Sequence, residues 1–214
     1  MKYYSLRPNA NKKNIARVET VVSGYKLVGC NTHSTEVRVP RLDGVLEVKL
    51  RNIGNKFGEV LISEDYEETI IISSNVKNLW IKNGFVSEFV FGSVKIQEPF
   101  PGALNGLDAP EYYVIDKSKL PQVPYDIERL PCKLEGICPE CGTYLYDTKE
   151  IAMVMYLDNK EWPYDKEKVR GKDLFLIGPG KYMFGEYPHC TENFKRETEK
   201  EFGNIFKYYF VHEE

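Results

Sequence analysis

The stretch Thr69-Ile70-Ile71-Ile72-Ser73-Ser74 decides the fold class, because the period of the side-chain pattern changes within it. The three isoleucines form a β-branched run that favours a strand. Ser73-Ser74 then offers an N-cap for a helix in which Val76, Leu79 and Trp80 share one face at spacings i, i+3 and i+4. The sequence therefore predicts a strand that leads directly into a short amphipathic helix.

The same order of elements recurs near the C-terminus. Asn83-Gly84 ends the first helix, and residues 86–91 return to a strand pattern. The second set is predicted as a strand over 173–177, a helix over 192–202 and a closing strand over 205–211. We therefore predict a strand-rich α+β fold, with two strand–short helix–strand units packed together and a cysteine knuckle between them. The predicted lobes are residues 1–105 and 106–214, with one continuous domain as the alternative.

Cys138-Pro139-Glu140-Cys141-Gly142 is half of a typical metal-binding knuckle. Its C-x-x-C spacing lets both sulfurs reach one tetrahedral ion, and Cys132 lies six residues upstream as a third ligand. We predict structural Zn²⁺ with Cys190 as the fourth ligand. The alternatives for that position are His189, Cys30 and His33, and the alternative for the whole motif is a set of free thiols. A redox site is disfavoured, because a strand pattern follows the motif where a redox C-x-x-C would open a helix.

Length, composition and charge narrow the function classes. The chain has 214 residues, 42% hydrophobic and 29% charged, which suits one large domain or two small lobes. A net charge of −3 argues against a nucleic-acid binder, which usually carries a strongly basic face. No segment reaches the roughly 18 consecutive apolar residues of a membrane span, and residues 1–8 lack an apolar core and a small-residue cleavage site, so we expect no signal peptide there. Five cysteines, three of them at metal-ligand spacing, fit reduced thiols, so we expect a cytoplasmic protein.

Two exposed-looking features are candidates for contacts with a protein partner. The run Glu64-Asp65-Tyr66-Glu67-Glu68 is the densest acidic segment and predicts a negative surface for a basic partner. Trp162 begins the aromatic segment Trp162-Pro163-Tyr164, and such residues often anchor interfaces. The structural alternatives are a solvated hairpin loop for the acidic run and a lid on the core for the tryptophan.

No catalytic motif is visible. The chain has three histidines, and it contains neither a G-x-S-x-G nucleophile elbow nor an H-E-x-x-H helix. We therefore expect a protein that is not an enzyme, with dispersed catalytic residues as the alternative.

Several segments together resemble immunity proteins of bacterial polymorphic toxin systems. These segments are Tyr3–Pro8, Ile70–Leu79, Tyr112–Asp116 and Gly171–Phe175. One subgroup of the family usually carries two C-x-x-C-G motifs, whereas this chain has one copy plus Cys132. The resemblance implies a cytosolic inhibitor that neutralises a toxin encoded by a neighbouring gene through direct stoichiometric binding. A zinc-knuckle module for nucleic acid or protein, or an unrecognised enzyme, is the alternative.

Overall fold

The computed structural model describes residues 1–11, 14–29, 38–51, 54–63, 69–124, 134–140, 144–146, 166–177 and 187–213. It confirms a strand-rich α+β fold, built from a closed barrel, a five-stranded sheet and two small two-stranded sheets. The α-helices of the described part are α1 (Ser74–Lys82), α3 (Lys166–Val169) and α4 (Glu192–Phe202).

The barrel has the strand order β3-β4-β8-β9-β7-β6. Its strands are β3 (Arg17–Gly29), β4 (Arg38–Arg51), β6 (Val60–Ser63), β7 (Ile70–Ser73), β8 (Phe91–Ile96) and β9 (Tyr112–Ile115). Alternate residues of these strands point inward, so that Val18, Leu46, Val48 and Leu61 fill a barrel core together with Leu104 from the 3₁₀ turn at Gly102–Leu104. The short strands β2 (Asn14–Ile15) and β5 (Gly54–Lys56) pair beside the barrel.

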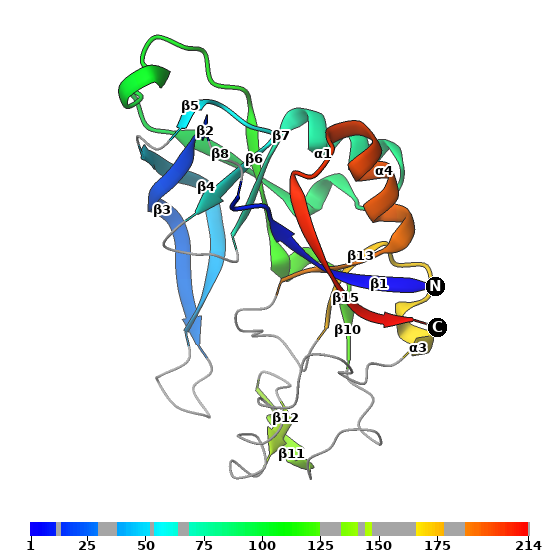
Figure 1. Ribbon diagram of the computed structural model, residues 1–214. Helices are drawn as coiled ribbons and strands as arrows, with labels where there is room; N and C mark the ends of the chain where they lie inside the picture. The colour runs from blue at the N-terminus through cyan, green and yellow to red at the C-terminus, as the bar shows by residue number, and fades with distance from the viewer. Residues whose placement is uncertain are drawn as a thin grey trace.

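The five-stranded sheet has the order β10-β13-β14-β1-β15. It joins β1 (Lys2–Pro8) to β10 (Gln122–Val123), β13 (Leu174–Ile177), β14 (His189–Thr191) and β15 (Phe206–Glu213). β1 runs antiparallel to both β14 and β15, and the N- and C-termini lie close together at one end of the sheet (Figure 1). β15 forms the outer edge of this sheet.

One hydrophobic core connects α1, α4, the barrel and the five-stranded sheet. α1 and α4 lie on one side of the sheet, while α3 lies on the other (Figure 1). The Trp80 ring lies 4.8 Å from the Phe194 ring, and its Nε1 donates a hydrogen bond of 3.0 Å to Oγ1 of Thr198 on α4. Both Trp80 and Thr198 are completely buried. Residues on both sides of position 105 thus share this core, and β1 and β9 each pair with strands from the other side of that position.

The first predicted unit is confirmed up to the end of its helix. The Ser73 hydroxyl accepts a hydrogen bond from the Val76 N–H as the N-cap of α1, and Gly84 follows the helix with a positive φ of 72°. The strand predicted over 86–91 is wrong, because Glu88–Val90 forms a 3₁₀ turn and β8 begins only at Phe91. Phe89, Val90 and Phe91 are aromatic or β-branched residues that favour a strand, but only Val90 of the three is buried, and Phe89 is 64% exposed.

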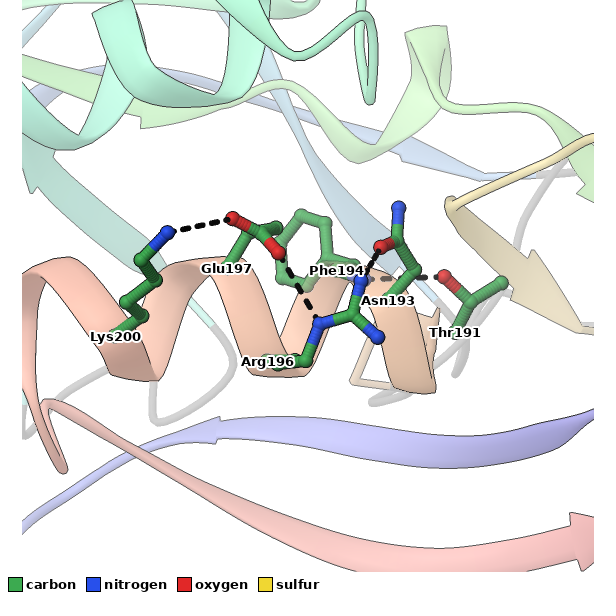
Figure 2. Close-up of polar contacts among 6 residues, drawn as sticks. All are labelled: Thr191, Asn193, Phe194, Arg196, Glu197 and Lys200. Carbon is green, nitrogen blue, oxygen red and sulfur yellow. Dashed lines mark hydrogen bonds and ion pairs between the residues drawn. The ribbon is translucent and has the colours of Figure 1, made fainter.

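The predicted C-terminal helix is confirmed at both ends. Thr191 caps α4 by accepting a hydrogen bond from the Phe194 N–H, and Gly203 follows Phe202 with a φ of 65°. Figure 2 shows the polar side of the helix, where Arg196 donates to Asn193 at 2.5 Å and to Glu197 at 3.1 Å. The opposite side carries Phe194 into the core, as an amphipathic helix requires.

Two strands flank the described part of the cysteine motif. β11 (Leu134–Ile137) pairs antiparallel with β12 (Tyr144–Tyr146), and β12 confirms that a strand follows the motif. Within the described ranges, no helix is long and apolar enough to cross a membrane.

Candidate binding surface

The predicted metal ligands are only partly covered by the structure. Cys132 and Cys141 lie outside the described residues, as do the alternative ligands Cys30 and His33. Cys138 follows directly after β11 and is 1% exposed, which suits a closed structural ligand. The described residues contain no group of three or more His, Cys, Asp or Glu side chains placed to hold a metal ion.

Cys190 lies in a different environment. It is completely buried on the face of β14 that packs with Leu174 and Phe194 in the core shared with α1 and α4. Burial raises the pKa of the Cys190 thiol well above its usual range, and this effect outweighs the nearby Lys195 ammonium, which lowers it. The surroundings of Cys190 in the described chain therefore favour the neutral thiol over the thiolate that zinc binds.

The predicted partner contacts lie outside the described residues. This applies to all five residues of the acidic run, which are Glu64, Asp65, Tyr66, Glu67 and Glu68. It applies equally to Trp162. The binding roles of these residues stay predictions. The described residues form a different candidate surface.

That surface lies on one face of the five-stranded sheet beside its outer strand β15, and we call Arg7, Tyr187, Lys207 and Tyr209 the Arg7 surface. The Arg7 guanidinium carbon lies 4.5 Å from the centre of the Tyr187 ring and 4.9 Å from that of Tyr209. Arg7 is exposed, and Tyr209 is 47% exposed. Contacts of this type hold a guanidinium in place while its N–H groups stay available to an acceptor.

Two positive charges face each other across the strand pair at this surface. Arg7 of β1 is the register partner of Lys207 of β15, so both side chains point to the same face. The ion pairs found among the described residues include neither Arg7 nor Lys207. Like charges directly opposite each other destabilise a strand pair, so this arrangement costs the free protein some stability.

A half-buried histidine lies beside the Arg7 surface on the same face of the sheet. His189 pairs with Ser5, and Ser5 in turn pairs with Tyr209. Parts of the His189 residue reach the surface, but its Nδ1 is fully shielded and has no hydrogen-bond partner among the described residues. Burial, and to a smaller degree the Arg7 charge, lowers the pKa of His189 to about 4. The imidazole is therefore neutral near pH 7 and adds no third positive charge.

A pocket lies between the barrel and the segment after α4. This pocket of about 250 Å³ is lined mainly by apolar side chains, among them Phe57, Ile62 and Ile205, together with Lys56 and Glu59. The Glu59 carboxylate accepts hydrogen bonds from the Ser73 hydroxyl and from the Asn75 side chain at the start of α1. Glu59 therefore stabilises the helix N-terminus, where the helix dipole favours a negative charge.

The sequence does not predict the Arg7 surface. Lys207 and Tyr209 lie in the closing strand expected over 205–211. The alternation of Lys207 and Tyr209 in that strand was a usable signal for a shared face. The pairing of the two terminal strands was not visible in the sequence, since nothing local specifies which strands become neighbours.

Comparisons with known proteins give no identity. No protein-family model matches the sequence. No curated protein matches it at a significant level.

Proposed function

We propose that this protein is an immunity protein that neutralises a cognate bacterial toxin by direct stoichiometric binding. The observation that supports this function best is the Arg7 surface, which combines exposed tyrosine and arginine beside the outer strand β15. Tyrosine and arginine are enriched among the residues that dominate the energy of protein interfaces. A binding protein needs such a surface, while a soluble protein without partners gains nothing from it.

Inhibition by binding requires no chemistry on the part of this chain. A patch of roughly 800 Å² on each partner is enough to cover an active site or a substrate groove. The Arg7 surface, in which Tyr209 is 47% exposed, gives such a patch its centre. We propose further contacts from the acidic run at 64–68 and from Trp162, which add a negative charge and an aromatic anchor.

A growth-rescue experiment tests this function. The neighbouring gene is induced in a bacterial host with and without this chain, and growth is followed together with complex formation between the two purified products. We expect the neighbour's product to arrest growth, this chain to restore it, and the two proteins to elute together in a 1:1 ratio. Absence of both rescue and complex contradicts the proposal. Its corollary is that the protein acts in the cytoplasm, where it meets the toxin before secretion.

We also propose a structural Zn²⁺ held by Cys132, Cys138 and Cys141, with Cys190 as the fourth ligand. Such an ion would cross-link the cysteine segment and stabilise it. The buried position of Cys138 supports this proposal, while the apolar surroundings of Cys190 make the fourth ligand its weakest part. Metal analysis of the purified protein should find about one zinc per chain, and none in Cys138→Ser. Zinc retained in Cys190→Ser would remove Cys190 from the ligand set.

A further inference from the structure

We propose that the outer edge of β15 binds an extended acidic segment of the partner protein, whose carboxylate is held by Arg7 and Lys207. This inference rests on the proposed function, because the partner is taken to be the toxin. It names the kind of segment that the partner presents, and it places the contact on a surface of positive charge. The acidic run at 64–68 has the opposite charge, so the two contacts would engage different parts of the toxin.

The first argument is the open edge. β15 is the last strand in the order β10-β13-β14-β1-β15, so in the described part of the chain only one of its two rows of backbone N–H and C=O groups meets another strand. β15 is eight residues long and pairs with β1 along seven register positions. Proteins usually blunt an edge of this length, since it is a template for another chain. An extended segment can add to such an edge, with affinity from main-chain hydrogen bonds and specificity from alternate side chains.

The second argument is the charge on one face of that edge. Arg7 and Lys207 are register partners, and neither takes part in an ion pair among the described residues. Their mutual repulsion is offset when a carboxylate comes within reach of both, and this effect adds to the attraction of the carboxylate itself. An incoming strand places every second side chain on this face, directly beside Lys207.

The third argument is the pre-organisation of Arg7. Its guanidinium contacts the rings of Tyr187 and Tyr209, so less side-chain freedom is lost when a ligand binds. A planar guanidinium also matches the two oxygens of a carboxylate, which a lysine does not. The occupant that fits is therefore a strand with glutamate or aspartate at the position that reaches both charges.

The matched variants follow from these contacts. Arg7→Gln and Lys207→Gln each remove one positive charge and keep a long polar side chain. Arg196→Gln is the control, because Arg196 is an exposed arginine that already binds Asn193 and Glu197 of its own helix (Figure 2). Far-UV circular dichroism of each variant confirms that the fold is intact.

The first experiment measures the affinity of the full chain for the neighbouring gene's product by calorimetry. Arg7→Gln and Lys207→Gln should each weaken binding at least tenfold, while Arg196→Gln changes it less than twofold. The backbone amides of residues 206–213 that face away from β1 should become protected from hydrogen exchange in the complex. The inference is overturned if the wild-type chain binds and both variants bind within twofold of it, or if these amides stay unprotected. The proposed function stands in either case.

The second experiment separates the inference from the proposed function. A capped hexapeptide with alternating valine and glutamate, and a matched peptide with glutamine in place of glutamate, are titrated into the ¹⁵N-labelled protein. We expect the glutamate peptide to shift the amide resonances of β15 and to bind at least fivefold tighter than the glutamine peptide, with the difference lost in Arg7→Gln. If the neighbour's product fails to bind, the proposed function fails and this peptide result alone decides the inference. No shift at millimolar peptide, or equal shifts with both peptides, overturns it.

Discussion

The hydrogen bond between Trp80 and Thr198 joins the two halves of the chain, and its removal tests whether they fold as one unit. The indole Nε1 of Trp80 on α1 donates to the Thr198 hydroxyl on α4 over 3.0 Å, and both residues are completely buried. Thr198→Val keeps the shape of the side chain but removes the acceptor. The indole N–H is then buried without a partner, which costs about 1–3 kcal/mol.

A double-mutant cycle isolates this contribution. Trp80→Phe removes the donor, so Thr198→Val in that background leaves no unpaired N–H. We expect Thr198→Val to lower the free energy of unfolding by about 2 kcal/mol in the wild-type background and by less than about 0.5 kcal/mol in the Trp80→Phe background. For a chain of this size, 2 kcal/mol corresponds to a fall in Tm of roughly 4–8 °C.

Chemical denaturation followed by far-UV circular dichroism measures these free energies. A single transition in all four proteins is expected, because the core around Trp80 contains strands and helices from both halves. Equal costs of Thr198→Val in both backgrounds would show that the hydrogen bond does not stabilise the fold. Two separate transitions would show that residues 1–105 and 106–214 unfold independently, against the shared core described above.

Three further predictions concern single positions. Gly24→Ala should destabilise the protein by about 2–4 kcal/mol, since Gly24 has a φ of 100° and a Cβ would lie 2.4 Å from the Val45 carbonyl oxygen. Gly44→Ala is the control and should cost only about 1–2 kcal/mol, because Gly44 has a φ of 84° but open space around the Cβ. Equal losses of stability in thermal unfolding would refute the steric argument. Tyr208→Phe should leave the free energy of unfolding unchanged or raise it by about 1 kcal/mol, because the Tyr208 hydroxyl lies near the Thr198 hydroxyl without completing a hydrogen bond in the described chain. A clear decrease in this free energy, measured by chemical denaturation, would show that the Tyr208 hydroxyl is hydrogen-bonded in solution. Hydrogen bonding and charge from Lys95 lower the pKa of Glu47. The ionised Glu47 carboxylate therefore stabilises the folded state above its usual pKa of about 4.5, and this contribution is lost as the pH falls through the lowered pKa. NMR titration should show that Lys95→Met raises the pKa of Glu47, and an unchanged pKa would count against the ion pair.

Local signals in the sequence predicted much of the secondary structure. α1 and α4 follow the expected bounds because serine and threonine caps, glycine stops and apolar spacing all act within one or two turns. The error at residues 86–91 has a related origin. Phe89, Val90 and Phe91 are aromatic or β-branched residues typical of a strand, but this composition does not distinguish a strand from the 3₁₀ turn that ends at Val90.

The strand neighbours could not be predicted from the same signals. No local sequence signal in Lys2–Pro8 indicates that this strand pairs with β15, 200 residues later, or that Arg7 lies opposite Lys207. The closed barrel has the same property, since β4 pairs in parallel with β8 across a long connection. Pairing of this kind depends on the global arrangement of hydrophobic faces, and the Arg7 surface exists only as its consequence.

The Arg7 surface itself is easier to explain by binding than by folding. Evolution for stability alone would place a carboxylate opposite Arg7, as it does at other sites in this protein, where Lys95 meets Glu47 at 3.0 Å and Lys49 meets Glu19 at 3.2 Å across neighbouring strands. At the sheet edge the register partner of Arg7 is instead another cation. A strand pair that keeps such repulsion in the free state gains most when an anion arrives, because relief of the repulsion adds to the affinity. The cost of the cation pair to the free protein is therefore an argument that its partner is anionic and comes from outside the chain.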